Sequence, residues 1–190
     1  MTYTEQYLSE TAEIASKIDA EAIEAMVKEL ISLREHNGRL FVLGLGGSAA
    51  NASHAVNDFR KLCGIEAYAP TDNVAELTAR MNDEGTKHIF DSYITSMKEN
   101  DAVMVLSVGG GVFDVSYAIS WAVRMCDNLG FKILGIVGRD GGETKQRGDC
   151  VLIIPTVESS RVTPHTEGWQ SVILHCLVSH PDLQREHTKW

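Results

Sequence analysis

The spacing of hydrophobic residues changes along the chain, from a helical repeat near the N-terminus to short continuous runs further on. Over residues 20–36, apolar residues return every three or four positions, which is the spacing of one face of a helix. Asp19 can cap the start of this helix, and Asn37-Gly38 would end it. A further helix is predicted over residues 3–17. The chain therefore begins with two predicted helices.

Five short apolar runs follow, and we predict a β-strand for each of them. They lie at 39–44, 65–69, 102–107, 131–137 and 150–154. The middle and late runs are apolar at consecutive positions, as expected for strands that are buried on both faces. Helical patterns separate the runs, and they lie at 48–62, 86–98, 112–128 and about 164–179. This alternation predicts an α/β fold in which a doubly wound, five-stranded parallel sheet has helices on both faces.

The composition is that of one folded domain. The chain has 190 residues, of which 44% are hydrophobic and 23% are charged, and it shows no repeat or linker. We expect a single domain over 1–190. Its predicted parts are N-terminal helices over 1–37, an α/β sandwich over 38–180 and a C-terminal tail over 181–190.

The net charge and the spacing of the cysteines indicate which kinds of partner the protein would bind and in which cellular compartment we expect it. A formal net charge of −9 disfavours nonspecific binding to nucleic acid and to anionic membranes. No apolar run approaches the ~18 residues that a membrane span needs, and the polar N-terminus does not resemble a signal peptide. The four cysteines form no CxxC pair, so we expect reduced thiols and a cytoplasmic protein.

Two glycine-rich turns follow predicted strands and precede predicted helices. In the first turn, Gly44, Gly46 and Gly47 allow close approach of the backbone to a ligand, and Ser48 opens a helix whose N-terminus favours an anion. The second turn is SVGGGV at 107–112. Two such turns on neighbouring strands suit a phosphorylated sugar between them. The alternative is a tight turn in which Ser48 is merely the N-cap.

A dinucleotide site is a minor alternative for the first turn. Gly44-x-Gly46-x-x-Ala49 fits the G-x-G-x-x-G/A pattern, and Glu66 follows at about the right distance to bind a ribose. However, that acid belongs at the carboxyl end of the second strand, and Glu66 lies near its start. The pattern also leaves the second glycine turn unexplained.

Two acid–imidazole pairs lie on the helices that flank these turns. His54 and Asp58 are four residues apart on one helix face, and Glu167, Ser171 and His175 share a face of the last helix. A surface ion pair and a packed histidine are the simpler interpretations. If the two pairs instead meet at the same strand ends, their side chains would act as general acid–base partners or as ligands for a divalent metal. Glu167 and His175 are about 12 Å apart along the helix, so they share a ligand only if their side chains lean together.

The motifs together resemble those of sugar isomerase (SIS) domain proteins of the phosphoheptose isomerase type, over nearly the whole chain. They are two leading helices, GLGGSAANASH at 44–54, Asn82-Asp83-x-Gly85, SVGGG at 107–111, GRDGG at 138–142 and a last helix with Glu167 and His175. The resemblance implies a five-stranded parallel sheet and a homotetramer with sites at subunit contacts. It also implies interconversion of sedoheptulose 7-phosphate and D-glycero-D-manno-heptose 7-phosphate, for bacterial lipopolysaccharide or capsule heptose.

The resemblance also assigns roles to residues. Gly46, Gly47 and Ser48 would bind the sugar phosphate, Asn82 and Asp83 its hydroxyls, and Ser107 with the amides of Gly109 and Gly110 its phosphate. A metal site, for which zinc fits best, would consist of His54, Asp58, Glu167 and His175. Asp58 and His175 would be the catalytic acid–base pair, and Glu167 would also contact substrate. No nucleotide cofactor is implied.

The sequence departs from the family pattern at several of these positions. The family usually has Asn at position 45, Glu at 58 and Gln at 167, where this chain has Leu45, Asp58 and Glu167. The phosphate loop retains a single hydroxyl, that of Ser107. Two functions therefore compete: an aldose–ketose isomerase that works through an enediol, and a non-catalytic sugar-phosphate sensor or protein-binding adaptor. The retained imidazole and carboxylate groups favour the isomerase.

Overall fold

A five-stranded, wholly parallel sheet forms the centre of the computed structural model, which describes residues 1–112 and 114–187. The strand order is β2-β1-β3-β4-β5. The strands are β1 (Leu40–Leu43), β2 (Ala67–Tyr68), β3 (Ala102–Ser107), β4 (Lys132–Val137) and β5 (Cys150–Ile153). The predicted sheet is confirmed, although β2 is shorter than the apolar run at 65–69 suggested.

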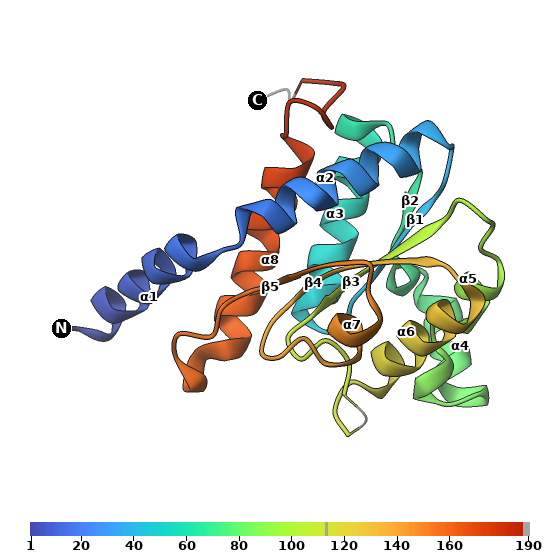
Figure 1. Cartoon of the computed structure of the whole chain (residues 1–190). Coiled ribbons are helices and arrows are strands. Elements are labelled where there is room, and N and C mark those ends of the chain that lie inside the picture. The colour runs from blue at the N-terminus through green and yellow to red at the C-terminus, as the bar shows by residue number, and fades with distance from the viewer. Residues whose placement is uncertain (113, 188–190) are drawn as a thin grey trace.

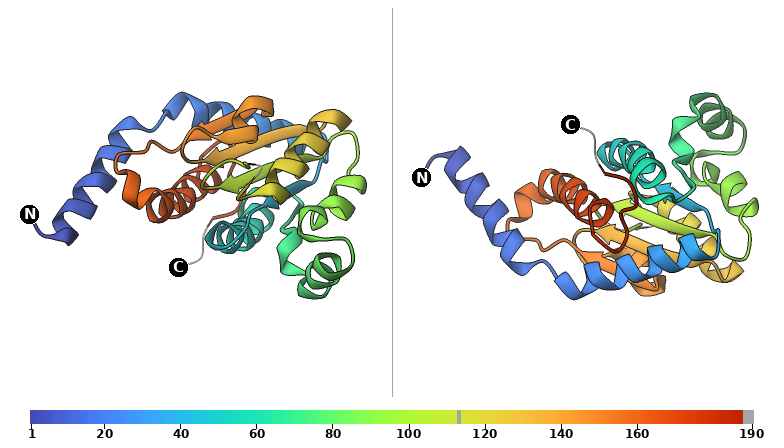
Figure 2. Two further views of the ribbon diagram at one scale, coloured as in Figure 1. Left: turned by 90° about the horizontal axis from the view of Figure 1, so that it is seen from below. Right: turned by 90° about the horizontal axis from the view of Figure 1, so that it is seen from above.

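Helices cover both faces of the sheet (Figures 1 and 2). They are α1 (Tyr3–Lys17), α2 (Ala20–Glu35), α3 (Gly47–Cys63), α4 (Val74–Asp83), α5 (Asp91–Thr95), α6 (Tyr117–Leu129), α7 (Gly142–Arg147) and α8 (Val162–Val178). Three short 3-10 turns complete the described structure: η1 (Pro70–Asp72), η2 (Thr86–His88) and η3 (Ser159–Arg161). The prediction of a doubly wound fold is confirmed.

The sheet divides the core into two hydrophobic clusters. Because side chains alternate along a strand, Leu40 and Val42 of β1 join the cluster formed with α2, α3 and α8. Phe41 and Leu43 of the same strand join the cluster formed with α5 and α6. Every residue of β3 is buried, which agrees with its continuous apolar sequence.

Two predictions for helices need correction, and two helices were not predicted. The helix predicted over 86–98 is instead η2 followed by the short α5. Ile89, Phe90 and Ile94 are buried there, which gives helical spacing although the backbone is not one continuous helix. The helix predicted from 112 begins at Tyr117. Sequence analysis missed α4 and α7. The apolar residues Val74, Leu77 and Met81 of α4 have helical spacing but none of them is buried, and α7 has six residues.

The N-terminal helix α1 extends away from the sheet and its covering helices (Figures 1 and 2). Thr2 caps it: its hydroxyl accepts a hydrogen bond from the Glu5 amide at 3.2 Å, and Glu5 accepts one from the Thr2 amide at 2.7 Å. Glu10 and Ile14 are its buried residues. None of the helices in the described ranges has the length and apolar character to cross a membrane.

Candidate active site

The glycine turn after β1 gives α3 an open N-terminus. Gly46 is the N-cap residue with φ +60°, and no side chain caps the helix there. A Cβ atom on Gly44 would lie 2.4 Å from the Ser48 carbonyl oxygen, so the turn needs glycine at that position. The predicted strand–turn–helix unit is therefore present. The amides of Ala49 and Ala50 donate to the Gly46 carbonyl oxygen at 3.0 and 3.3 Å.

The side chain of Ser48 belongs to a buried polar network between α3 and α8. Its hydroxyl donates a hydrogen bond to Gln170 Oε1 at 3.0 Å, and Asn51 Nδ2 donates to the same oxygen at 3.1 Å. Asn51 Nδ2 also lies 2.9 Å from the Glu167 carbonyl oxygen. Gln170 is fully buried and donates to the Ile136 carbonyl oxygen of β4 at 3.4 Å. Sequence reasoning missed Gln170, although a glutamine in an apolar part of α8 was a usable signal.

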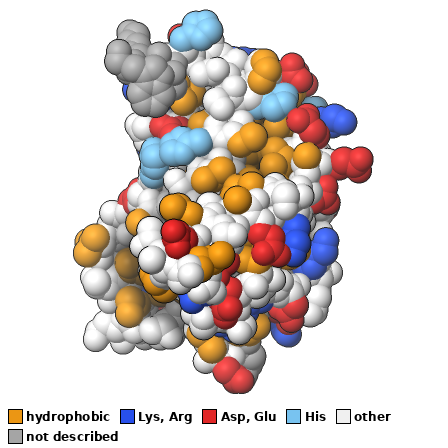
Figure 3. Space-filling view, turned by 90° about the vertical axis from the view of Figure 1, so that its left-hand side faces the viewer, with side chains coloured by type: hydrophobic (Ala, Val, Ile, Leu, Met, Phe, Trp, Pro, Cys, Tyr) orange, Lys and Arg blue, Asp and Glu red, His pale blue; other side chains and the backbone are white. Residues whose placement is uncertain are grey.

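Three predicted site residues converge between α3 and α8. The Asp58 carboxylate oxygen Oδ2 lies 3.3 Å from His54 Nε2 and 3.9 Å from His175 Nε2. The two imidazole rings meet edge to face, with their centroids 5.0 Å apart. The Asp58 side chain is 15% exposed, whereas both imidazoles are more than half exposed, so solvent or a ligand can reach them. Figure 3 shows several histidine side chains exposed on the face of the molecule that it presents.

This triad has the composition of a metal site. One ligand atom from each of His54, Asp58 and His175 lies within 4.8 Å of the other two. Two imidazole nitrogens and a carboxylate oxygen are a donor set that binds zinc and other divalent transition metals. These three side chains would therefore be the ligands if such a metal binds here.

Glu167 lies apart from the triad. Its carboxylate stands over Gly47, where an added Cβ atom would come within 2.4 Å of Glu167 Oε2. This places a negative charge at the N-terminal end of α3, which the helix dipole favours. Glu167 is not among the residues whose ligand atoms cluster, so its role as a fourth metal ligand stays a prediction.

The glycines of the loop at 107–111 pack against the start of α7. The Gly110 carbonyl oxygen accepts hydrogen bonds from the Thr144 amide at 2.9 Å and the Thr144 hydroxyl at 2.7 Å. A Cβ atom on Gly110 would lie 1.9 Å from the Gly141 carbonyl oxygen. The Ser107 hydroxyl is also engaged, because it accepts from the Gly110 amide at 3.1 Å. Gly109 has open space around it. Close packing thus explains part of the glycine content of this loop.

Asn82 and Asp83 lie at the exposed end of α4. Asn82 Nδ2 donates to Asp83 Oδ1 at 2.7 Å. Neither residue is among those that line the cavity described below or the hollow at the histidine triad. Their predicted contact with sugar hydroxyls stays a prediction.

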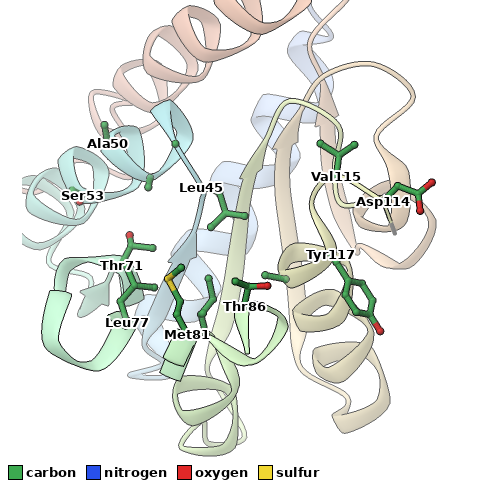
Figure 4. Close-up of a pocket in the computed structure, with 14 residues that line it drawn as sticks. Leu45, Ala50, Ser53, Thr71, Leu77, Met81, Thr86, Asp114, Val115 and Tyr117 are labelled. Carbon is green, nitrogen blue, oxygen red and sulfur yellow. The ribbon is translucent and has the colours of Figure 1, made fainter. Parts of the chain in front are cut away.

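A cavity with a volume of about 610 Å³ lies where β1 and β3 end (Figure 4). Leu45 and Gly46 follow β1, while Asp114 and Val115 belong to the segment between β3 and α6. Its apolar lining was not predicted. The lining residues are Leu45, Gly46, Ala49, Ala50, Ser53, Thr71, Leu77, Met81, Thr86, Ile89, Asp114, Val115, Tyr117 and Ala118.

The geometry around Glu66 argues against a dinucleotide. Glu66 precedes β2, and its carboxylate accepts a hydrogen bond from the Tyr68 hydroxyl at 2.6 Å. An acid that binds a ribose would lie at the other end of this strand.

Comparison with known proteins identifies the family. The phosphoheptose isomerase of Geotalea daltonii is 32% identical to the chain over 160 residues, which cover 80% of this chain and 79% of the relative. The chain belongs to the phosphoheptose isomerase family. The phosphoheptose isomerase of Helicobacter pylori strain P12 is 28% identical over 178 residues, which cover 87% of this chain and 90% of that protein. No protein-family model matches the sequence.

A solved structure supports the fold of this phosphoheptose isomerase family member. The structure of a phosphoheptose isomerase from Francisella tularensis superposes with a TM-score of 0.81 at 24% identity, covering 94% of this chain and 97% of the other. The predicted resemblance, the SIS-type fold and the assignment to an isomerase class of enzyme are thereby confirmed.

Proposed function

We propose that this protein is a sugar-phosphate aldose–ketose isomerase, and that it interconverts sedoheptulose 7-phosphate and D-glycero-D-manno-heptose 7-phosphate. The observation that carries the proposal is the meeting of His54, Asp58 and His175 at one point between α3 and α8. Family membership supports the isomerase class, because these relatives are named for that activity. The whole chain, 1–190, would serve as one SIS domain, with the site in its α/β sandwich.

Asp58 and His175 supply the proton transfers in this proposal. The Asp58 carboxylate removes the proton from the carbon next to the carbonyl, which forms an enediol, and it returns that proton to the neighbouring carbon. The His175 imidazole moves the second proton between the carbonyl and hydroxyl oxygens. Each positioned transfer of this kind typically contributes about 10²–10⁴-fold to the rate. Asp58 is the most buried of the three side chains, which reduces competition from water.

A divalent metal, for which we propose zinc, would be held by His54, Asp58 and His175, with Glu167 as a candidate fourth ligand. When bound, it supplies Lewis-acid polarisation of the carbonyl oxygen. His54 is on the same face of α3 as Asp58, and its imidazole lies next to that of His175. Its role is to complete the donor set.

In this proposal, backbone amides bind the phosphate group of the substrate. Gly46, Gly47 and Ser48 at the N-terminus of α3, and Ser107, Gly109 and Gly110 after β3, would supply these donors once the Glu167 carboxylate leaves Gly47 and the Gly110 amide leaves the Ser107 hydroxyl. Backbone amides at helix starts and in such loops bind phosphate without a basic side chain. The open space at Gly109 fits this assignment. Asn82 and Asp83 would need to approach the sugar from the end of α4.

We also propose a homo-oligomer, with a tetramer as the expected form. α1 stands away from the sheet and exposes Tyr3 and Leu8, which are 65% and 62% exposed. A second copy that packs on α1 would bury these side chains.

A sugar-phosphate sensor without turnover is the second candidate. The loop at 107–112 supports it, because the Ser107 hydroxyl is engaged within the loop and the neighbouring Val108 and Val112 add no donor side chain. A sensor would be stabilised by sugar phosphate without converting it.

The test is to incubate purified protein with sedoheptulose 7-phosphate, with and without added zinc, and to follow formation of the aldoheptose phosphate. We expect turnover by the wild type and a loss of about 10²-fold or more in kcat for Asp58→Asn and His175→Gln. His36→Gln is the matched control, because His36 is exposed at the end of α2 and its ring contacts the Ser32 carbonyl oxygen. It should keep the wild-type rate.

Two outcomes would count against the proposal. An inactive wild type that is nevertheless stabilised against heat by sedoheptulose 7-phosphate would favour the sensor. Full activity of His175→Gln would remove the residue assignment and leave the isomerase. Metal analysis of the untreated protein and of His54→Ala tests the donor set independently.

A further inference from the structure

The hollows at the carboxyl ends of the strands contain no positive charge to offset that of a phosphate. The chain carries a formal net charge of −9, which disfavours the approach of an anion. No lysine or arginine is among the described residues that line the cavity at the ends of β1 and β3 or the hollow at the histidine triad. The Glu167 carboxylate over Gly47 adds a negative charge. A cation from another segment at this edge of the sheet would therefore favour a phosphorylated substrate.

Arg139 lies at this edge, in the segment that connects β4 to α7. The segment packs along the loop that follows β3 at two points. Before Arg139, the Gly138 amide donates a hydrogen bond to the Ser107 carbonyl oxygen at 3.2 Å. After Arg139, the backbones nearly touch, because a Cβ atom on Gly110 would lie 1.9 Å from the Gly141 carbonyl oxygen. Arg139 is therefore held beside the loop to which we assign the phosphate.

The backbone of Arg139 adopts a conformation that arginine rarely takes. Its φ is +51°, in the left-handed region where the Cβ atom crowds the backbone. The other positive φ angles among the described residues belong to glycines and to Asn37, and these residue types tolerate the region best. An arginine gives the turn no local advantage over glycine or asparagine. Its presence indicates a use for the side chain, as with strained residues at other ligand sites.

The Arg139 side chain is exposed and has no hydrogen bond, ion pair or ring contact with another described residue. The neighbouring Asp140 carboxylate accepts a hydrogen bond from the Gly142 amide at 3.2 Å instead. By contrast, Arg147 of the adjoining α7 is paired with Glu143 at 2.6 Å. A free guanidinium presents parallel N–H groups that match the oxygens of a phosphate.

These observations give the unpaired arginine a partner. We propose that the Arg139 guanidinium binds the phosphate group of the substrate, at the open position beside Gly109. It supplies the charge and the donors that the side chains of the loop do not provide, since Ser107 is engaged within the loop and Val108 and Val112 carry no donor. The inference deepens the proposed function and rests on it for the identity of the sugar.

The test compares a sugar phosphate with the same sugar without its phosphate. Isothermal titration would measure the binding of sedoheptulose 7-phosphate and of sedoheptulose to the full-length protein. We expect Arg139→Gln to weaken binding of the phosphate by about tenfold or more, because a hydrogen bond to a charged group typically contributes that factor. Binding of sedoheptulose should not change. Arg139→Lys keeps the charge without the bidentate contact, so its affinity should lie between those of the wild type and Arg139→Gln.

Two further variants show whether the side chain or the turn is responsible. Arg139→Gly removes the guanidinium and relieves the left-handed backbone. It should weaken sugar-phosphate binding as Arg139→Gln does, and its melting temperature should not fall below that of the wild type. Arg185→Gln is the matched control. Arg185 is exposed, and its amide donates to the Leu62 carbonyl oxygen at 2.7 Å, at the opposite end of α3 from the glycine turn. This variant should keep the wild-type affinity for both ligands.

The outcomes separate this inference from the proposed function. A sugar-phosphate affinity that Arg139→Gln leaves unchanged, or an equal loss of affinity for sedoheptulose, overturns the inference even if the heptose phosphate is isomerised. A loss confined to the phosphorylated sugar supports it even if no aldoheptose phosphate forms. If sedoheptulose 7-phosphate does not bind, inorganic phosphate is the probe. Stabilisation of the wild type against heat by inorganic phosphate, abolished in Arg139→Gln, supports the inference, and any other result with this probe overturns it.

Discussion

At the scale of single residues, Gln170 shows how the site is held in shape. Its side-chain amide joins α8 to the start of α3 through Ser48 and Asn51, and joins both helices to β4 through the Ile136 carbonyl oxygen. Because Gln170 is fully buried, no water replaces these partners when one of them is removed. The network therefore fixes the spacing of the two helices that carry the triad.

Removing Gln170 should cost more stability than removing Ser48. Gln170→Leu leaves the Ser48 hydroxyl and the Asn51 amide without their common acceptor, and we expect a loss of about 2 kcal/mol or more in the free energy of unfolding. Ser48→Ala leaves Gln170 paired with Asn51 and should cost about 1 kcal/mol. Urea unfolding measures both values. Gln146→Leu, on the exposed surface of α7, is the matched control and should change stability little.

The sequence predicted the triad because its members depend on simple periodicities. His54 and Asp58 are one turn apart on one helix, and His175 follows from the expectation that helices beside the same strand ends lie close together. The position of Glu167 depends on its side-chain conformation, which no spacing rule fixes. The apolar cavity draws single residues from many segments, so no local pattern in the sequence marks it.

At the scale of elements, a buried ion cluster attaches α1 to the start of α8. Glu10 accepts hydrogen bonds from Arg161 Nε at 2.8 Å and Arg161 Nη2 at 2.6 Å, and its Oε2 lies 2.9 Å from His165 Nε2. The ring of Tyr7 stacks on the His165 ring with the centroids 4.4 Å apart. Glu10 is one of two buried residues of α1, so much of the attachment of the helix depends on this cluster.

The Glu10 cluster should weaken in acid. The Arg161 guanidinium, and after it the His165 imidazole, lower the pKa of the Glu10 carboxyl from its ordinary value of 4.5 to about 2. A carboxyl with a lowered pKa stabilises the fold above its unfolded value and loses that contribution as the pH falls from about 4.5 toward 2. Glu10→Gln should therefore be less stable than the wild type at pH 7, and the difference should shrink across this range.

Thermal melting at several pH values between 7 and 2.5 would measure that difference. Glu13→Gln is the control, because Glu13 lies on the same helix in an exposed ion pair with Lys17. It should differ little from the wild type at any pH. A constant gap between Glu10→Gln and the wild type down to pH 2.5 would show that the ionised carboxylate is not what holds α1.

Helices that bury a regular apolar face against the sheet were predicted well. The helices α2, α3 and α8 bury regular faces against the sheet, and they agree with prediction within about two residues at each end. α4 has apolar residues at helical spacing, Val74, Leu77 and Met81, but it buries none of them and was missed. The segment from 112 to 116 is apolar enough to suggest a helix, but α6 begins after it.

At the scale of the whole molecule, α3 separates two regions with different chemistry. One flank of α3 carries Asn51, His54 and Asp58 toward α8 and the triad. Its other flank carries Ala49, Ala50 and Ser53 toward the apolar cavity. Both flanks begin at the same glycine turn, so a ligand bound at the N-terminus of α3 has the catalytic groups on one side and the apolar wall on the other.

The exposed N-terminal helix α1 allows the proposed oligomer to be tested. α1 has 15 residues, and a helix of that length is marginal in water without packing partners. We expect the wild type to have a mass near four times the 20.9 kDa chain in light scattering coupled to gel filtration. Leu8→Glu places a charge on an exposed apolar position of α1. It should lower the measured mass, and the oligomer of this variant should dissociate more readily on dilution.

Leu129→Glu, on α6 and 53% exposed, is the control and should keep the wild-type mass. A wild type that elutes as a monomer at micromolar concentration would show that α1 is held within its own chain, by the Glu10 cluster and buried Ile14.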